Sequence, residues 1–118
     1  MDCLFCKIIA KEIPSKTVYE DDRCFAFRDI NPQAPTHILI VPRKHFAKIA
    51  DMAADDKELV GHLHWAAKEI AAGHVGAIHE SPLRDFRIVI NNGEEAGQTV
   101  WHLHLHLLSG RPFSWPPG

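Results

Sequence analysis

Apolar residues recur at helical intervals in two parts of this chain. Between Leu4 and Lys11 they occupy positions i, i+1, i+4 and i+5, which places them on one face of a short helix that Pro14 stops. A longer helix is predicted to begin at Asp55 and to end before Gly73, because apolar residues repeat there at intervals of three and four. The pattern therefore predicts one short and one long helix.

Strand patterns account for most of the remaining apolar residues. Val18–Glu20 and Cys24–Asp29 alternate apolar and polar residues around an acidic turn, which predicts a hairpin. The continuous apolar run in Thr36–Val41 predicts a buried strand, and Phe86–Ile90 and Val100–Leu108 predict two more. We therefore expect an α+β fold, built on an antiparallel meander of about five strands.

Length and composition fit one folded domain spanning residues 1–118. Of the 118 residues, 46% are apolar and 24% are charged, as in ordinary globular proteins, and the length allows one sizeable core. No apolar run approaches the roughly 20 residues that a membrane-spanning helix needs. We therefore expect neither export nor insertion into a membrane.

Charge and cysteine content narrow the partners and the compartment. The net charge is −2, and no run of basic residues exceeds two, so the chain lacks the basic footprint of a protein that binds nucleic acid polymers. Its three cysteines are an odd number without an export signal, which argues against a disulfide framework. The expected location is the cytoplasm.

Three of the nine histidines alternate with apolar residues near the C-terminus. On a strand, His102, His104 and His106 share one face at intervals of about 6.7 Å, while the odd-numbered residues of 101–107 pack against the long helix. A purely structural face would favour Thr or Ser, because neighbouring imidazoles repel once charged. We expect the three rings to line one cleft, as a metal cage or as metal-free acid–base and nucleophilic groups.

The loop before this strand favours phosphate chemistry. Residues 93–99 hold two glycines, a side-chain amide and a hydroxyl, and such a loop can direct small donors at phosphate oxygens. Together, residues 97–108 resemble the signature of the histidine triad (HIT) family, which is His-x-His-x-His after Gly-Gln-Ser/Thr. The likeness extends through residues 8–14, 29–37 and 115–118, and it is greatest to the histidine triad nucleotide-binding branch, the purine nucleoside phosphoramidases.

The resemblance implies a set of catalytic residues. His104 matches the nucleophile, which becomes nucleotidylated while its other ring nitrogen donates to the backbone carbonyl at His102. His106 matches a residue beside the phosphate and the leaving group. Thr99 matches a phosphate-binding Ser, and His37 matches a fourth histidine that supports the cluster.

The resemblance also implies a nucleotide-binding site in this chain. Asp29 matches the carboxylate that binds the ribose hydroxyls. The base pocket matches Phe5, Ile8, Phe27 and Ile30, and the ribose and phosphate contacts match Asn91, Gly97, Gln98 and Thr99, with His104 and His106. The family fold implies a homodimer with a continuous ten-stranded sheet, in which the tail, residues 111–118, lies near the partner's site.

A second group of residues has the spacing of metal ligands. Cys3 and Cys6 lie three residues apart on one helix face, and a metal, a redox role or burial as small apolar groups are all open from this spacing alone. Some family members hold a structural zinc at the positions of Cys3, Cys6, His45 and His102, which form a Cys2His2 set here. The remaining histidines are expected on the solvated surface: His62, His64, His74 and His79.

Three functions remain open at this point. The first is hydrolysis of purine nucleoside 5′-monophosphoramidates, which releases AMP or GMP and an amine and needs no cofactor for its chemistry. The second is hydrolysis of dinucleoside polyphosphates, although that branch typically follows its triad with Pro-Arg, whereas Ser109–Arg111 follows it here. The third is a non-catalytic scaffold that binds a nucleotide or zinc.

Overall fold

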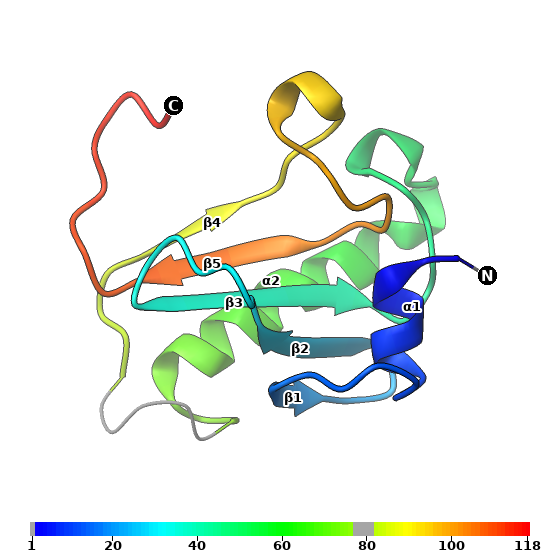
Figure 1. Cartoon of the computed structure of the whole chain (residues 1–118), viewed down its shortest axis with the longest axis horizontal. Coiled ribbons are helices and arrows are strands. Elements are labelled where there is room, and N and C mark those ends of the chain that lie inside the picture. The colour runs from blue at the N-terminus through cyan, green and yellow to red at the C-terminus, as the bar shows by residue number, and fades with distance from the viewer. Residues whose placement is uncertain (1, 77–81) are drawn as a thin grey trace.

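A computed structural model describes residues 2–76 and 82–118, and a five-stranded sheet carries two helices within them (Figure 1). His79 lies outside the described residues. All neighbouring strands are antiparallel, as expected. Neither described helix is long and apolar enough to cross a bilayer. The strand order is β1 (Thr17–Glu20), β2 (Cys24–Arg28), β3 (Thr36–Pro42), β5 (Leu105–Ser109) and β4 (Phe86–Val89).

This order departs from the expected meander, because β5 lies between β3 and β4. The connection from β3 to β4 runs through the long helix α2 (Lys57–Ala72), so β4 does not have to pair with β3 directly. The last strand in the sequence, β5, is therefore an interior strand of the sheet and not an edge strand. This places β5 beside β3, where its His106 meets His37 of that strand.

Helix α2 covers one face of the sheet, as the apolar spacing predicted. It ends at Gly73, whose φ of 79° is a left-handed conformation that glycine adopts without strain. The helix packs Leu63, Ala66, Ala67 and Ile70 against one face of β2, β3 and β5. Burying this layer removes apolar area from water and so stabilises the fold.

The short helix α1 (Leu4–Ile9) covers only part of the opposite face (Figure 1). Its buried residues, Phe5 and Ile8, pack on β2 and β3, so both faces of these strands are covered and β3 reads as a continuous apolar run. The helix ends two residues earlier than expected, because Lys11 adopts a left-handed φ of 63°. On the same side of the sheet, His106 on β5 and His104 just before it are not covered by α1, and a cleft forms there.

The last strand is shorter than predicted. Pairing between β3 and β5 ends at Ile40 and Leu105, so residues 100–104 do not form a strand. The chain bonds instead to the loop after β3, where the Leu103 amide donates to the Phe46 carbonyl at 2.8 Å. Leu103 is still buried, but Trp101 is 46% exposed, so the prediction that Trp101 packs in the core was wrong.

The hairpin turn between β1 and β2 is joined to α2 by a side-chain network. Asp21 accepts hydrogen bonds from Tyr19, from the backbone amides of Arg23 and Cys24, and from His62 on α2. His62 is therefore a partly buried partner of Asp21, and its assignment to the solvated surface was wrong, whereas His64 and His74 are exposed. Burial alone would raise the pKa of Asp21, but these donors hold it well below its usual range.

Replacing Asp21 should destabilise the chain in a pH-dependent way. At pH 7, Asp21→Asn is expected to lower the free energy of unfolding by about 2 kcal/mol, because the charged acceptor is lost. A carboxylate with a depressed pKa stabilises above its unfolded pKa of about 3.9, and this stabilisation is lost as the pH falls. Urea unfolding at pH 7 and pH 3 measures both. The exposed neighbour Asp22, changed to Asn, is the control, and equal losses at both pH values would contradict the interpretation.

Candidate active site

A cleft of about 530 Å³ opens between α1, the end of β2, and β5. This volume suits a small ligand. Most of the predicted nucleotide and catalytic residues line it, although they come from five separate segments of the chain. These are Phe5, Ile8, Phe27, Asp29, Ile30, His37, Gly97, Thr99, His104 and His106.

Three predicted residues lie outside this lining. The lining includes neither Asn91 nor Gln98, and the ring of His102 faces a different cluster, so the three triad rings do not share one cleft. The buried Gln98 side chain donates to two backbone carbonyls and accepts from the Gly93 amide at 2.9 Å. Its amide therefore shapes the loop that presents Gly97 and Thr99. Ile30 is 99% exposed and lies at the mouth of the cleft.

The geometry of His104 fixes where its proton lies. Its Nδ1 is 2.7 Å from the carbonyl oxygen of His102, and since a carbonyl only accepts, Nδ1 carries the proton. The side chain is buried, and burial lowers the pKa of His104 although the His102 carbonyl and Asp29 act in the opposite direction. His104 is therefore neutral at pH 7, with a lone pair on Nε2.

A second chain of hydrogen bonds sets the proton on His106. The backbone amide of Gln33 donates to Nδ1 of His37 at 3.0 Å, so the neutral His37 ring carries its proton on Nε2. That Nε2 lies 2.9 Å from Nδ1 of His106 and 3.4 Å from Asp29. His106 accepts on Nδ1 and keeps its proton on Nε2. Burial, with the neighbouring rings of His104 and His37, lowers the pKa of His106 to about 4.

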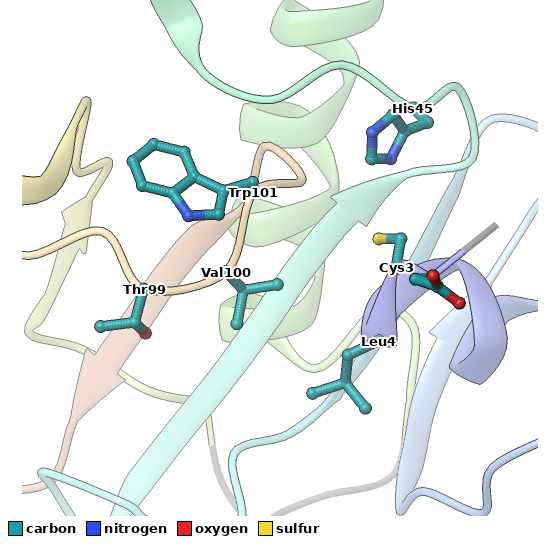
Figure 2. A pocket seen from close by; sticks show the side chains of 7 residues that line it. Cys3, Leu4, His45, Thr99, Val100 and Trp101 are labelled. Atoms are coloured by element: carbon teal, nitrogen blue, oxygen red, sulfur yellow. The ribbon is translucent and has the colours of Figure 1, made fainter.

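A smaller cavity of about 400 Å³ adjoins the cleft (Figure 2). The two cavities share three lining residues, Leu4, Thr99 and Val100. Trp101 and His45 form further walls of the smaller one, with Asp2 and Cys3. A ligand bound in the cleft beside Thr99 could therefore extend into a second space.

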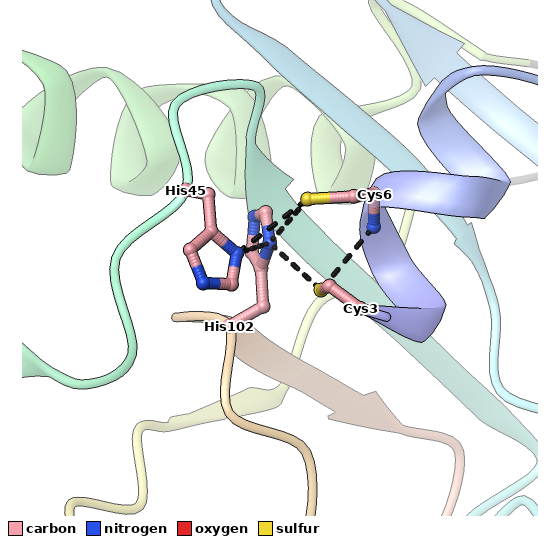
Figure 3. Close-up of side chains that lie close together, drawn as sticks. All are labelled: Cys3, Cys6, His45 and His102. Carbon is pink, nitrogen blue, oxygen red and sulfur yellow. Dashed lines mark hydrogen bonds between the residues drawn. The ribbon is translucent and has the colours of Figure 1, made fainter. Parts of the chain in front are cut away.

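The ring of His102 belongs to a cluster with Cys3, Cys6 and His45 (Figure 3). Nδ1 of His102 lies 3.4 Å from the sulfur of Cys3, 3.6 Å from the sulfur of Cys6 and 3.0 Å from Nδ1 of His45. The sulfur of Cys6 lies 3.5 Å from Nδ1 of His45. Residues far apart in sequence thus direct four metal-binding atoms at one point.

These separations fit a tetrahedral zinc ion. Zinc–nitrogen and zinc–sulfur bonds of about 2.0 and 2.3 Å place neighbouring ligand atoms about 3.3 to 3.8 Å apart. His102 is also held in the right tautomer, because its Nε2 donates to the Pro42 carbonyl at 2.8 Å and leaves the Nδ1 lone pair toward the cluster. Four protein ligands leave no open coordination position, which is typical of a structural site.

Several groups in the site carry no sequence signal. The Gln33 amide and the Pro42 carbonyl orient His37 and His102, but both are backbone atoms that any residue type offers. The alternating pattern predicted that the Trp101 side chain lies in the core, because it shares odd-numbered positions with the buried leucines, but it is exposed instead. Its role depends on where β5 begins, which the alternating pattern does not show.

Comparison with known proteins shows the family. The HIT domain matches residues 10–113, so the chain belongs to the HIT family. A HIT-like protein of Synechocystis, itself uncharacterised, is 55% identical and covers 99% of this chain and 97% of its own length. A HIT family hydrolase from Legionella pneumophila is 48% identical, with a TM-score of 0.90 over 99% of this chain and all of its own. A zinc-bound histidine triad protein from Mycobacterium smegmatis is 28% identical, with a TM-score of 0.77 over all of this chain and 81% of its own.

The protonation of His106 can be tested directly. In a histidine NMR titration, we expect His106 to remain neutral with its proton on Nε2 at pH 7 and to titrate near pH 4. Asp29→Asn should lower this pKa further, because the carboxylate is the neighbour that raises it. A midpoint near 6.5 in the unaltered chain would contradict the buried hydrogen-bonded arrangement.

Proposed function

We propose that this chain is a hydrolase of purine nucleoside 5′-monophosphoramidates that releases AMP or GMP and an amine through a nucleotidyl intermediate on His104. The observation that carries the proposal is the bond from Nδ1 of His104 to the His102 carbonyl at 2.7 Å. It holds a neutral imidazole with its nucleophilic nitrogen free, in a cleft of suitable size. This arrangement supports nucleophilic catalysis more directly than a ligand-binding role alone.

The first step joins the nucleotide to the enzyme. Nε2 of His104 attacks the α-phosphorus, the P–N bond breaks, and its electron pair goes to the nitrogen. The negative charge of the bound phosphoryl group favours protonation of His106 on Nδ1, although its pKa is otherwise low, and the Nε2 proton of His37 then turns from this nitrogen to Asp29, 3.4 Å away. His106 then gives its Nε2 proton to the nitrogen, and the amine leaves uncharged.

The second step releases the nucleotide. Water attacks the phosphorus while His106, now neutral, accepts a proton from it. The bond between phosphorus and His104 breaks, and the ring leaves as the neutral imidazole that kept its Nδ1 proton throughout. His106 then loses its Nδ1 proton to solvent as the nucleotide leaves. The same two rings thus serve both steps, and the enzyme returns to its starting state without a cofactor.

The remaining lining residues support binding of a nucleoside monophosphate. Phe5, Ile8 and Phe27 offer a buried apolar surface for a base, and the Phe5 and His104 rings form a T-shaped pair with 5.1 Å between their centroids. Asp29 directly follows β2 and is an acceptor for ribose hydroxyls. The hydroxyl of Thr99, beside Gly97, is a donor for phosphoryl oxygens.

Replacing the nucleophile should abolish turnover but not binding. We expect His104→Ala to lower kcat/KM for adenosine 5′-phosphoramidate at least about 10³-fold, while AMP still binds. Mass spectrometry of the unaltered enzyme quenched during turnover should detect a nucleotide adduct on His104. His64→Ala, an exposed histidine on α2, is the matched control. Unchanged turnover in His104→Ala, or an adduct on another residue, would refute the role.

We also propose that Cys3, Cys6, His45 and His102 hold a structural zinc ion. The fit of their ligand atoms to a tetrahedron supports this, as does the zinc-bound relative from Mycobacterium smegmatis. The ion would fasten α1 to the loop after β3 and to the segment before β5. The ring of His102 would bind the metal while its carbonyl orients His104.

Elemental analysis tests the metal. We expect one zinc per chain, and none in the double variant Cys3→Ser, Cys6→Ser, which should also melt at a lower temperature because metal binding stabilises the folded state. Cys24→Ser is the control, because Cys24 lies in a separate cluster with Asp21 and His62. Undamaged protein without zinc, or loss of zinc in the control alone, would remove the proposed site.

Assembly as a homodimer belongs to the same proposal. Strand β4 is at the edge of the sheet, where Phe86 is 39% exposed, and an edge strand can pair with a second copy. The tail, residues 111–118, carries Trp115, which is 83% exposed. Both features support a ten-stranded sheet in which the tail lies near the partner's cleft. We place this homodimer in the cytoplasm, as the odd number of cysteines suggests.

A further inference from the structure

The chain directly after β5 packs against the loop between β2 and β3, residues 29–35. Gly110 has a left-handed φ of 101°, and a Cβ atom at its position would lie 2.8 Å from Cβ of Pro35, so a larger residue would not fit without moving the loop. The next residue, Arg111, donates from Nε to the backbone carbonyl of Gln33 at 3.0 Å. Two successive residues after β5 therefore hold the same loop.

Gln33 connects this contact with the cleft through its two backbone groups. Its carbonyl accepts from Arg111, and its amide donates to Nδ1 of His37 at 3.0 Å. Only the φ and ψ angles of Gln33 separate these two peptide planes, so a bond that fixes the carbonyl also limits where the amide can lie. The bond from Arg111 therefore helps to keep the amide on the His37 ring.

We propose that Arg111 is a positioning residue for His106. It acts through the backbone of Gln33 and the ring of His37, and it is exposed and does not line the cleft. The Gln33 amide needs an acceptor at Nδ1 of His37, which leaves the His37 proton on Nε2, 2.9 Å from Nδ1 of His106. His106 consequently keeps its own proton on Nε2. The inference rests on the proposed hydrolysis, in which this Nε2 proton goes to the leaving nitrogen.

The other tautomer of His37 would disturb both neighbours of this ring. With its proton on Nδ1, His37 would turn the lone pair of Nε2 toward the Asp29 carboxylate, 3.4 Å away, and toward His106. Neutral His106 would then carry its proton on Nδ1 and would have no Nε2 proton ready for the departing nitrogen. Asp29 by itself still favours a proton on Nε2 of His37, so loss of the Gln33 bond gives a mixture of tautomers.

A second arginine lies on the same aromatic ring but bonds elsewhere. The guanidinium carbon of Arg111 lies 4.4 Å from the centre of the Phe113 ring, and that of Arg87 lies 5.1 Å from it. Arg87 donates to the Ser114 carbonyl at 3.0 Å, whereas Arg111 donates to Gln33. Removing Arg87 therefore loosens the tail without removing the bond to the loop, and Arg87→Ala is a matched control for Arg111→Ala.

Nitrogen NMR of the histidine rings tests the positioning role without a substrate. In Arg111→Ala at pH 7, we expect neutral His106 to change from the Nε2–H form to a mixture with the Nδ1–H form. Arg111→Lys should restore most of the Nε2–H form, because it keeps a donor for the Gln33 carbonyl. Arg87→Ala should leave the tautomers unchanged. Unchanged tautomers in Arg111→Ala, or equal changes in both alanine variants, would overturn the proposal.

Kinetics connect the tautomer with turnover. For adenosine 5′-phosphoramidate, we expect Arg111→Ala to lower kcat/KM about threefold, Arg111→Lys to recover most of it, and Arg87→Ala to match the unaltered enzyme. Unchanged kcat/KM in an Arg111→Ala enzyme whose tautomers do shift would contradict the positioning role. If the unaltered enzyme hydrolyses no phosphoramidate, the proposed function fails, whereas the NMR comparison still decides whether Arg111 sets the proton on His106.

Discussion

The hydrogen bond from Nδ1 of His104 to the carbonyl of His102 connects the cleft with the Cys3, Cys6, His45 and His102 cluster. A buried imidazole is a nucleophile only if one nitrogen is free, and this bond decides which one it is. The bond depends in turn on where the backbone of His102 lies. That backbone is placed by the packing of Leu103 and by the bond from the His102 ring to the Pro42 carbonyl.

His102 therefore serves two neighbouring sites with different parts of one residue. Its ring faces Cys3, Cys6 and His45, while its carbonyl faces the cleft. Anything that moves the ring also moves the acceptor on which the tautomer of His104 depends. A zinc ion bound to these four residues would consequently restrict the movement of residues 102–104 without taking part in the reaction.

The cleft itself results from the unequal coverage of the sheet. Helix α2 covers the face formed by β2, β3 and β5, whereas the six-residue helix α1 covers only β2 and β3 on the other side. The part of this face that remains carries His106, on β5, and His104, just before β5, in place of apolar residues. Their low pKa values follow from this position, since the rings are largely buried but are surrounded by few groups that stabilise a positive charge.

The sequence by itself determined the helices, most of the strands and which histidines could act together, because helical and extended periodicities are local properties. It also allowed the HIT family to be recognised from residues 97–108. Only the tertiary structure decided that β5 lies between β3 and β4, that it begins at Leu105, and that Trp101 and the His102 ring leave the expected faces. Strand register, the hydrogen bonds of Gln33 and Pro42, and the pairing of Asp21 with His62 join residues distant in the chain. Such contacts depend on the competition between all possible partners, and no local pattern of residues records its outcome.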